Sequence, residues 1–269
     1  MSGISAGGGV GAIQAGNLAE KNQQVLQDAF RKLASSLSIN RAADNAASLA
    51  IAERFNTEVQ GVNQATLNTN DGIAVTQIAE SGLQQIQEGQ QRLRELAVQS
   101  ANGALQDSDR RAIQAEATQI QEHIASIVED TNYNGQNLLT SSDKLSLQTG
   151  PDAGDQSGIK LTDFTNSFTT VDLSTQSGAE QAITSLMVDS NKVSTARAEL
   201  GAAESGLNTT ISQLSGLSEA LSASGSRIQD ADIARETSAL ANASIRANAG
   251  IAIQAQANQS SSRVHQLVQ

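Results

Sequence analysis

The fold of this chain is decided by the stretch Ile183–Ile228, which reads ITSLMVDSNKVSTARAELGAAESGLNTTISQLSGLSEALSASGSRI. Its apolar residues recur every seven positions and form one row, the rod seam, made of Leu186, Val193, Leu200, Leu207, Leu214, Leu221 and Ile228. A helix can bury such a row only against other long helices, and the strict period implies a gentle left-handed supercoil. At about 1.5 Å per residue, this helix would be roughly 70 Å long. The stretch therefore predicts a rod of packed helices.

The composition agrees with a narrow, aliphatic core. The chain has 269 residues, with one Pro, one Tyr, four Phe and neither Cys nor Trp. Because aromatic side chains usually dominate a globular core, their scarcity favours long helices packed side by side. The net charge of -11 argues against a nucleic-acid partner, since phosphate binding needs clustered Lys and Arg. No apolar run is long enough to span a membrane, and the N-terminus lacks the basic and apolar regions of a cleaved signal peptide.

Helical patterns also cover both ends of the chain. From Asn17 to Leu37 the apolar face consists of Val25, Leu26, Ala29, Phe30, Leu33 and Leu37. The preceding Met1–Gly16 is rich in Gly, which costs about 1 kcal/mol per helical position, so we expect it to fray when the chain is alone. The C-terminal segment Gln229–Gln269 places a few Ile and Leu among many Ala, a weak seam that is hard to stabilise by itself.

A second long helix is predicted from Ala46 to Ser100, after a break at Ser38–Asp44. Its seam is expected to contain Ile51, Phe55, Val62, Ala65, Ala79, Leu83, Ile86, Leu93 and Ala97, with small Thr69, Gly72 and Thr76 in the middle. Asn102-Gly103 should end this helix, and Asp107 or Ser108 can cap a third one. The third helix has a seam of Ile113, Ala117, Ile120, Ile124 and Ile127, so the three helices suggest a bundle.

The pattern changes after Asp130 to short alternating runs. Asn134-Gly135 is a tight-turn signal, and alternation with polar residues involves Leu145, Leu147, Ile159, Leu161, Val171 and Leu173. We read Leu138–Leu173 as one or two hairpins. The predicted fold is mainly α, a long antiparallel helical rod or coiled-coil bundle with a small β-hairpin region between its N- and C-terminal halves. We predict five segments: an N-terminal inner-core helix (1–43), long rod helices (44–137), the hairpin region (138–177), a C-terminal rod helix (178–228) and a C-terminal inner-core helix (229–269).

Motifs that could carry chemistry have simpler explanations. Gly3–Gly7 matches the G-x-S-x-G elbow of serine hydrolases, but no apolar strand precedes it. The only histidines, His123 and His265, have no partner at a zinc-binding spacing. Asp152 and Asp155 lack the alternating ligands of a calcium loop. We therefore predict no catalytic, metal or cofactor site, and no enzyme.

Several motifs resemble those of the bacterial flagellins. In the N-terminal half they are LASSLSIN (33–40), AIAERF (50–55), NDGI (70–73), QRLRELAVQSAN (91–102) and NYNG (132–135). In the C-terminal half they are SRIQDAD (226–232) and QAQANQ (254–259). The motifs occur in the family's order and span nearly the whole chain, and Leu173 is followed almost directly by a helix. The chain therefore resembles a short flagellin without variable outer domains.

The resemblance implies a structural subunit that polymerises with copies of itself into the extracellular flagellar filament. The terminal helices would pair as an inner layer, and their weak seams would be buried between subunits, so that assembly completes their folding. The residues expected to make this assembly surface are Val25, Phe30, Leu33, Leu37, Leu240, Ile245, Ile251 and Leu267.

Further partners also follow from the resemblance. They are a flagellar export chaperone and export gate, the filament cap and hook-junction proteins, and export would proceed without a cleaved signal peptide. The surface recognised by the host Toll-like receptor specific for flagellin maps onto Arg92, Leu96 and Glu116. We expect released monomer to activate that receptor.

Two other functions were weighed against the filament subunit. A hook-filament junction protein shares the terminal helices, but the intact motifs at 91–102 and 254–259 favour a flagellin. A secreted enzyme or adhesin built on flagellin ends would need an inserted domain. The chain also departs from the family, which usually has Gly at Ser36 and Arg at Ser38, and its extremities Ser2–Gly11 and Val264–Gln269 are atypical. These departures affect inner-layer contacts and not the fold.

Overall fold

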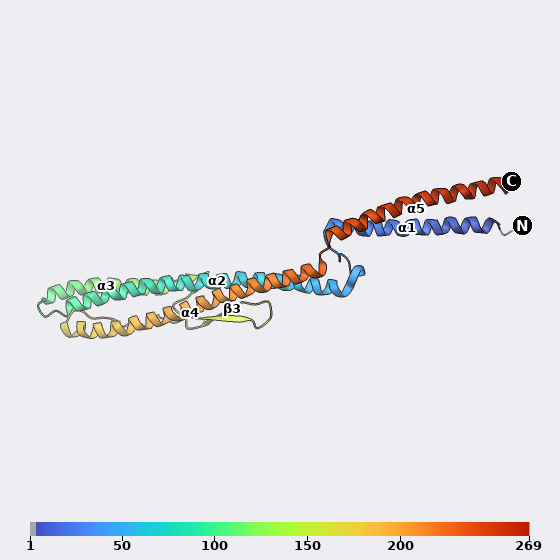
Figure 1. Ribbon diagram of the computed structural model, residues 1–269. Coiled ribbons are helices and arrows are strands. Elements are labelled where there is room, and N and C mark those ends of the chain that lie inside the picture. Colours follow the sequence, from blue (N-terminus) through green and yellow to red (C-terminus); the bar gives the residue numbers. More distant parts are fainter. Residues whose placement is uncertain (1–3, 269) are drawn as a thin grey trace. The chain divides into compact units, whose positions relative to one another are not determined.

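The computed structural model describes residues 4–268 and places most of them in helices (Figure 1). The elements are α1 (Ile4–Ser35), α2 (Ala42–Ser100), α3 (Asp107–Asp130), β1 (Asn132–Tyr133), β2 (Gln136–Asn137), β3 (Lys144–Gln148), β4 (Gln156–Lys160), α4 (Gln176–Gln229) and α5 (Ile233–Val268). The predicted fold class, mainly α with a small β region between two helical halves, is confirmed. The chain forms a central unit, Glu58–Glu219, and a terminal unit, Met1–Thr57 with Ala220–Gln269.

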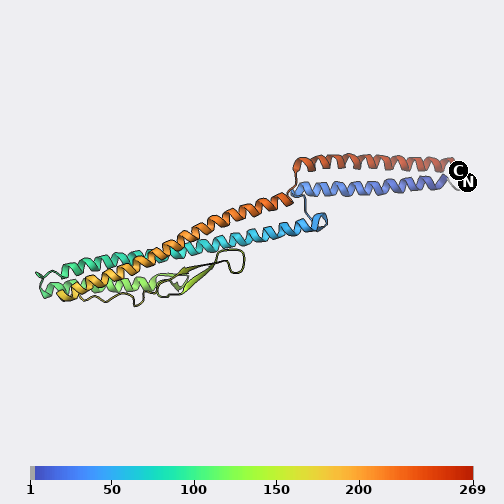
Figure 2. The ribbon, with the colours of Figure 1, turned by 60° about the horizontal axis from the view of Figure 1, so that its bottom comes forward.

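In the central unit, α2, α3 and α4 lie side by side (Figures 1 and 2). The part of the rod seam that belongs to this unit is buried in its core: Leu186, Val193, Leu200, Leu207 and Leu214. Leu186, Val193, Leu200 and Leu207 pack in one cluster with large side chains of α2, including Leu83, Ile86 and Leu93. Fully burying each such side chain contributes about 1.5–3 kcal/mol, so this unit holds a complete core of its own. Leu221 and Ile228, the last two seam residues, are half-buried in the terminal unit.

The middle of the α2 seam is made of small residues, as predicted. Thr69 and Thr76 are buried, and their hydroxyl groups donate hydrogen bonds to the carbonyl oxygens of Ala65 (2.7 Å) and Gly72 (2.8 Å). A Cβ atom at Gly72 would collide with the side chain of Leu147 on β3. The small residues therefore make room for the hairpin to lie against α2.

The N-terminal part of the α2 seam was predicted one residue out of place. Ile51 is exposed, and the buried residue is the neighbouring Ala52. A step of three residues back from Phe55 reaches position 52 and a step of four reaches position 51, so the spacing alone allows either. The structure buries the small Ala52 and leaves the large Ile51 outside.

The β region holds less strand than the alternation predicted. β3 and β4 pair antiparallel, with Leu145 opposite Ile159, and the two-residue strands β1 and β2 flank Asn134-Gly135. Both turn residues have positive φ (51° and 80°), the geometry that favours Asn-Gly in tight hairpins. Val171 and Leu173 are buried but lie in an irregular segment before α4, so the prediction of strands there is wrong. Burial of every second side chain does not require a ladder of hydrogen bonds.

The turn from α2 to α3 is closed by a buried arginine. Arg110 donates hydrogen bonds to the carbonyl oxygens of Ser100 (3.0 Å), Asn102 (2.8 Å) and Leu105 (2.7 Å). α3 begins at Asp107, so the predicted caps Asp107 and Ser108 are wrong and the cap residue is Gln106. Its backbone N–H donates to the Asp109 carboxylate at 3.1 Å, which supplies the anion expected at a helix start.

In the terminal unit, α1 and α5 run antiparallel along each other (Figures 1 and 2). α1 begins at Ile4 and so includes most of the glycine-rich stretch, whose first three residues lie outside the described part; that Met1–Gly16 frays in the separate chain stays a prediction. Helix propensity is a weak preference, and a neighbouring helix can override it. Asn45 has non-helical angles (φ -166°, ψ 98°) and its side chain accepts a hydrogen bond from the Ser48 N–H at 3.1 Å. It therefore caps the long helix, whose predicted start was Ala46.

Among the described helices, none combines the length and apolar character that crossing a membrane requires. The division into five segments stays a prediction about the layers of an assembled chain.

Candidate assembly surface

The contact between α1 and α5 is made mostly of small side chains. On α1 the inward positions recur every three or four residues at Ala15, Ala19, Asn22, Leu26, Ala29 and Leu33, and on α5 at Leu240, Ala243, Ala247, Gly250 and Gln254. Ala15, Ala29, Ala243 and Ala247 are buried. Gly250 lies 3.9 Å from the Cα of Ala19, as measured from the Cβ it lacks. Since an alanine side chain buries little area, this pair gains little from its own contact.

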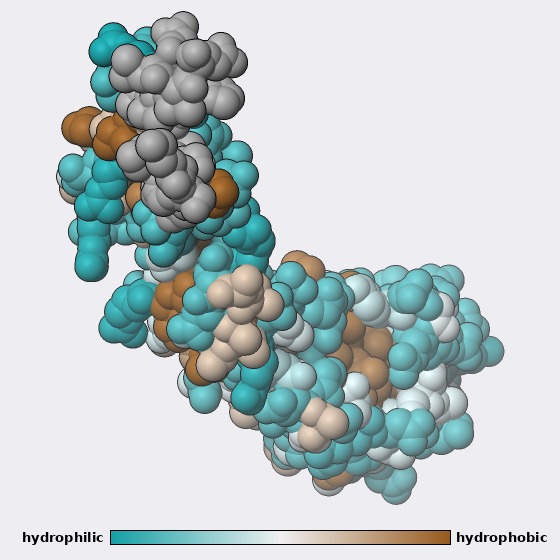
Figure 3. Space-filling view, turned by 90° about the vertical axis from the view of Figure 1, so that its right-hand side faces the viewer, coloured by the Kyte–Doolittle hydropathy of each residue, from teal (hydrophilic) through white to brown (hydrophobic). Residues whose placement is uncertain are grey.

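Several other large apolar side chains of the same helices lie at the surface, outside that contact. We call these exposed residues the outer rows, although they lie on more than one side of each helix: Ile13, Leu18, Val25 and Phe30 on α1, and Ile233, Ile245, Ile251 and Ile253 on α5. Phe30 is 55% exposed and Ile245 is 65% exposed. Apolar patches (brown) interrupt the hydrophilic surface on the face turned to the viewer in Figure 3. Many exposed large apolar residues on two paired helices are consistent with a surface that a partner covers.

The predicted assembly residues fall into two groups. Val25, Phe30, Ile245 and Ile251 lie in the outer rows. Leu33, Leu37 and Leu240 are half-buried within the terminal unit and are already partly used by the fold. The side chain of Leu267 lies outside the described residues. The predicted assembly surface left out Ile13, Leu18, Ile233 and Ile253, which are also exposed and whose spacing follows no single face of a helix.

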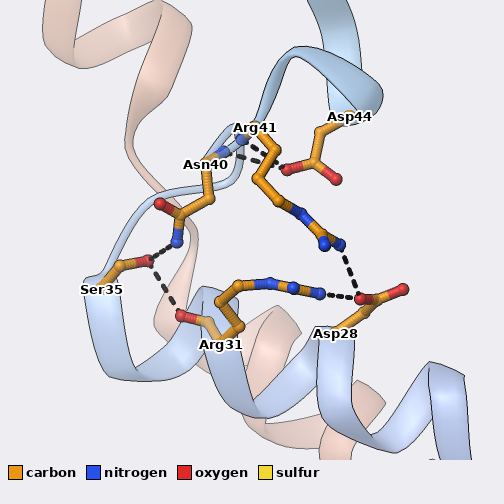
Figure 4. A network of polar contacts seen from close by, with 6 residues as sticks. All are labelled: Asp28, Arg31, Ser35, Asn40, Arg41 and Asp44. Atoms are coloured by element: carbon orange, nitrogen blue, oxygen red, sulfur yellow. Dashed lines mark hydrogen bonds and ion pairs between the residues drawn. The ribbon is translucent and has the colours of Figure 1, made fainter.

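A polar network fixes the turn between α1 and α2 (Figure 4). The Asp44 carboxylate accepts hydrogen bonds from the backbone N–H groups of Asn40 and Arg41, both at 3.0 Å. These bonds hold the pKa of Asp44 below its ordinary value, with the charge of Arg41 as a smaller cause. On α1, Asp28 pairs with Arg31 and, at 3.1 Å, with Arg41. Exposed pairs of this kind contribute at most about 1 kcal/mol each, but together they select one path for the turn.

The same turn is joined to the segment that connects α4 and α5. The Ser38 N–H donates to the carbonyl oxygen of Gln229 at 2.7 Å, and the Ala231 N–H donates to that of Ser36 at 2.9 Å. Leu37 and Asp230 form an antiparallel bridge. The side chain of Asn40 donates to the Ser35 hydroxyl at 2.7 Å (Figure 4). The turn between α1 and α2 and the segment between α4 and α5 are therefore held together by backbone hydrogen bonds.

Ser36 occupies a backbone conformation that suits glycine. Its φ of 59° lies in the left-handed region, which is unfavourable for a residue with a Cβ. A glycine, which the resemblance described above implies at this position, would adopt this φ freely, whereas the serine carries strain. Ser38, the second departure, uses its hydroxyl to donate to Gln229 at 3.3 Å.

The predicted receptor residues do not all lie at the surface. Arg92 on α2 and Glu116 on α3 are exposed and joined at 2.7 Å, and Arg92 also pairs with Glu95 at 3.0 Å. The Glu116 and Glu95 carboxylates raise the pKa of Arg92. Leu96 is only 2% exposed and belongs to the core of the central unit, so the isolated subunit does not present it. The exposed polar group at this place is Arg92 with Glu95 and Glu116.

The described residues contain no cluster of three or more His, Asp or Glu side chains that could hold a metal ion. The structure does bring together the outer rows of the paired helices α1 and α5 and the hydrogen-bonded turn between α1 and α2. Such an arrangement can serve contact between copies.

Comparison with known proteins identifies both halves of the chain. The model of the bacterial flagellin N-terminal helical region matches residues 10–144, and that of the C-terminal helical region matches residues 175–268. A flagellin of Halalkalibacterium halodurans is 38% identical over 248 residues, which are 90% of this chain and 91% of that protein.

Solved structures of other proteins have a similar fold. A crystal structure of Bacillus cereus flagellin, 27% identical, covers 55% of this chain and is itself 88% covered, with a TM-score of 0.51. A putative flagellar hook-associated protein from Vibrio parahaemolyticus has a TM-score of 0.62, covers 70% of this chain and is wholly covered. At 14% identity the second likeness concerns the fold alone.

Proposed function

Because the chain belongs to the bacterial flagellin family, it is a structural subunit of the extracellular flagellar filament, and we propose that copies assemble by covering the outer rows of α1 and α5. The observation that supports this is the inversion of side-chain size in the terminal unit. The fully buried positions of the paired helices are alanines, and many of their large apolar side chains are exposed. Burying an exposed Ile contributes about 1.5–3 kcal/mol, so each subunit that joins the polymer gains what the unassembled chain lacks.

Seeded polymerisation tests this proposal. Ile245→Ser should raise the critical concentration about tenfold or more, because 1.4 kcal/mol corresponds to a factor of ten. The helix content of the unassembled protein should change little, since Ile245 is exposed there. Asn242→Ser, at an exposed polar position of the same helix, is the matched control. An unchanged critical concentration for Ile245→Ser would remove the outer rows from the mechanism.

The receptor surface on the released monomer is a second proposal, supported by the exposed Arg92 group. Arg92 reaches two carboxylates on neighbouring turns and helices, and this fixes its guanidinium at the surface. In a reporter-cell assay, purified monomer should activate the flagellin-specific Toll-like receptor, and Arg92→Ala should weaken the response. Gln91→Ala, next to it on the exposed side of α2, is the control. No response to the unaltered monomer would rule this proposal out.

Export and capping belong to the proposal as well. The chain would leave the cell through the flagellar export gate with a chaperone, meet the cap and hook-junction proteins, and keep its N-terminus. Mass spectrometry of filament protein from the native cell should find the N-terminal peptide of this sequence intact. A shortened N-terminus would contradict export without cleavage. We further propose that the chain has no catalytic activity.

The hook-filament junction alternative has no observation in its favour. Negative-stain microscopy of seeded protein separates the two, since a filament subunit gives long tubes of uniform width and a junction protein gives short caps.

A further inference from the structure

The chain contains two Asn-Gly pairs, Asn102-Gly103 and Asn134-Gly135, and the backbone explains only one of the two glycines. Gly135 has a φ of 80°, which the tight hairpin turn requires and which glycine adopts freely. Gly103 has no positive φ, and a Cβ atom at this position would meet only the Gln176 Oε1 atom, at 3.7 Å, an ordinary contact. The turn between α2 and α3 could therefore hold an alanine in place of Gly103.

An asparagine followed by glycine can react with its own backbone, because glycine has no Cβ that obstructs the approach. The nitrogen of the following residue passes its proton to water and attacks the carboxamide carbon Cγ of the asparagine. The new N–Cγ bond closes an imide ring, and the side-chain nitrogen takes up a proton and leaves as ammonia. Water then opens the imide at either of its carbonyl carbons, which leaves an aspartyl or an isoaspartyl residue with a free carboxylate. The reaction needs no oxidant or reductant.

The carboxamide of Asn102 is held in a position that suits this attack. Its Oδ1 atom accepts a hydrogen bond from the Ala104 N–H at 3.0 Å. The ring that this bond closes contains the Gly103 nitrogen, so the bond keeps that nitrogen close to Cγ of Asn102. The same N–H stabilises the negative charge that gathers on Oδ1 when Cγ is attacked, as a donor in an oxyanion hole does.

The peptide group that supplies the attacking nitrogen is polarised as well. The carbonyl oxygen of Asn102 accepts hydrogen bonds from the Arg110 guanidinium at 2.8 Å and from the Leu105 N–H at 3.2 Å. Because a charged donor on this oxygen draws electrons from the peptide group, the Gly103 nitrogen loses its proton more easily. Asn102 and Gly103 are both exposed, so water can take up the proton and ammonia can leave.

We propose that Asn102 is a deamidation site, at which the folded turn itself promotes the conversion of the asparagine to aspartate and isoaspartate. This inference does not depend on filament assembly. Either product adds a negative charge to the turn. In the isoaspartyl form the main chain runs through the former side chain, which lengthens the connection between α2 and α3, and the oxygen that Arg110 binds becomes part of a carboxylate. The turn that closes the central unit therefore changes as the protein ages.

Deamidation rates of the folded and the unfolded chain test the proposal. The whole protein is incubated at mildly alkaline pH with and without enough guanidinium chloride to unfold it. Peptide mass spectrometry then measures deamidation, and a methyltransferase specific for isoaspartate labels that product. Deamidation of Asn102 should be about tenfold faster in the folded chain, the gain expected from about one hydrogen bond to the reacting carboxamide.

Asn134 is the matched control within the same samples. Ring closure there must pull Asn134 and Gly135 out of the left-handed conformation that the pairing of β1 with β2 holds, so folding should slow its deamidation. A rate at Asn102 that is the same or slower in the folded chain overturns the proposal. An equal acceleration at Asn134 overturns it too, since the geometry around Asn102 would then not be the cause.

A variant separates the reaction from the stability of the turn. Gly103→Ala fits the turn without a clash, so its unfolding temperature should be the same as that of the unaltered chain or slightly higher. Its deamidation at Asn102 should be slower by about tenfold or more, because the added Cβ obstructs the approach of the nitrogen. Ala104→Ser keeps the backbone N–H and should deamidate like the unaltered chain. An unchanged rate in Gly103→Ala would contradict the proposed ring closure.

Discussion

The central and terminal units use the same three-and-four spacing and place their large residues oppositely. In the central unit, Leu186, Val193 and Leu207 lie inside, and the small Thr69 and Gly72 make room for the hairpin. In the terminal unit, Ala29 and Ala243 lie inside, and Phe30 and Ile245 lie outside. A periodic apolar pattern therefore specifies which helices pair. The size of the inward residues decides whether the paired helices are stable without other copies of the chain.

This difference separates stability from assembly. The central unit buries its large aliphatics within one chain, so it should fold without neighbours. The terminal unit exposes many of its large apolar residues, and the proposed burial of these residues by other copies would couple its ordering to polymerisation. Each of the following predictions tests one side of this comparison.

The largest effect is expected inside the central unit. Leu207→Ala should lower the free energy of unfolding by about 2–5 kcal/mol, because it leaves a cavity in a fully buried seam. Ile251→Ala in the outer row of α5 should change it by less than about 0.5 kcal/mol in the unassembled protein. Urea unfolding followed by circular dichroism measures both. Equal losses for the two variants would abolish the distinction between the units.

A smaller loss is expected at the turn that closes the central unit. Arg110→Met removes a buried guanidinium that satisfies three carbonyl oxygens, and it should lower the free energy of unfolding by about 2–3 kcal/mol. Arg111→Met, at an exposed neighbouring position, should stay within about 0.5 kcal/mol. The same urea experiment decides, and a cost at Arg110 no larger than at Arg111 would show that the turn does not need its anchor.

In the terminal unit, relief of backbone strain should stabilise the fold. Ser36→Gly removes a Cβ from a left-handed conformation and should add about 1 kcal/mol of stability to the turn. Ser38→Gly should add none, because it loses the hydroxyl bond to Gln229 and its φ is not positive. Limited proteolysis at residues 36–41 measures the gain as slower cleavage. Faster cleavage of Ser36→Gly would mean that the serine itself contributes more than its strain costs.

The smallest effect is expected when the pH is lowered and the Asp44 carboxylate is protonated. The folded turn lowers the pKa of Asp44, so this group stabilises the turn above its unfolded pKa of about 4, and that contribution is lost as the pH falls through the lower folded value. The turn of the Asp44→Asn variant should therefore be cleaved faster by a protease than that of the unaltered chain at pH 7. The two cleavage rates should converge below about pH 4. A difference that persists unchanged in acid would assign the role of Asp44 to something other than its charge.

The sequence predicted the positions of the helices better than it predicted which of their residues are buried. The seven-residue row of α4 and the small middle of α2 were readable because a buried period repeats over many turns. Ile51 was misplaced because the pattern near a helix start has few repeats, and Ala52 next to it is also apolar. The outer rows were only half recognised, since an exposed Ile such as Ile253 looks like a core residue in a sequence.

Some features of the candidate sites could not be predicted from sequence. Leu96 sits in a motif with Arg92, and only the packing of α3 against α2 shows that one is buried and the other exposed. The strain at Ser36 is a property of the turn, although the family's usual glycine was a sign of it.

Hydrogen exchange measured on the dilute, unassembled chain and on its filaments tests the central claim most directly. The amides of α2, α3 and α4 in the central unit should be protected in both states, and those of α1 and α5 should exchange quickly until filaments form. Strong protection of α1 and α5 in a sample that is strictly monomeric would show that the terminal unit is complete without neighbours, and the account would fail.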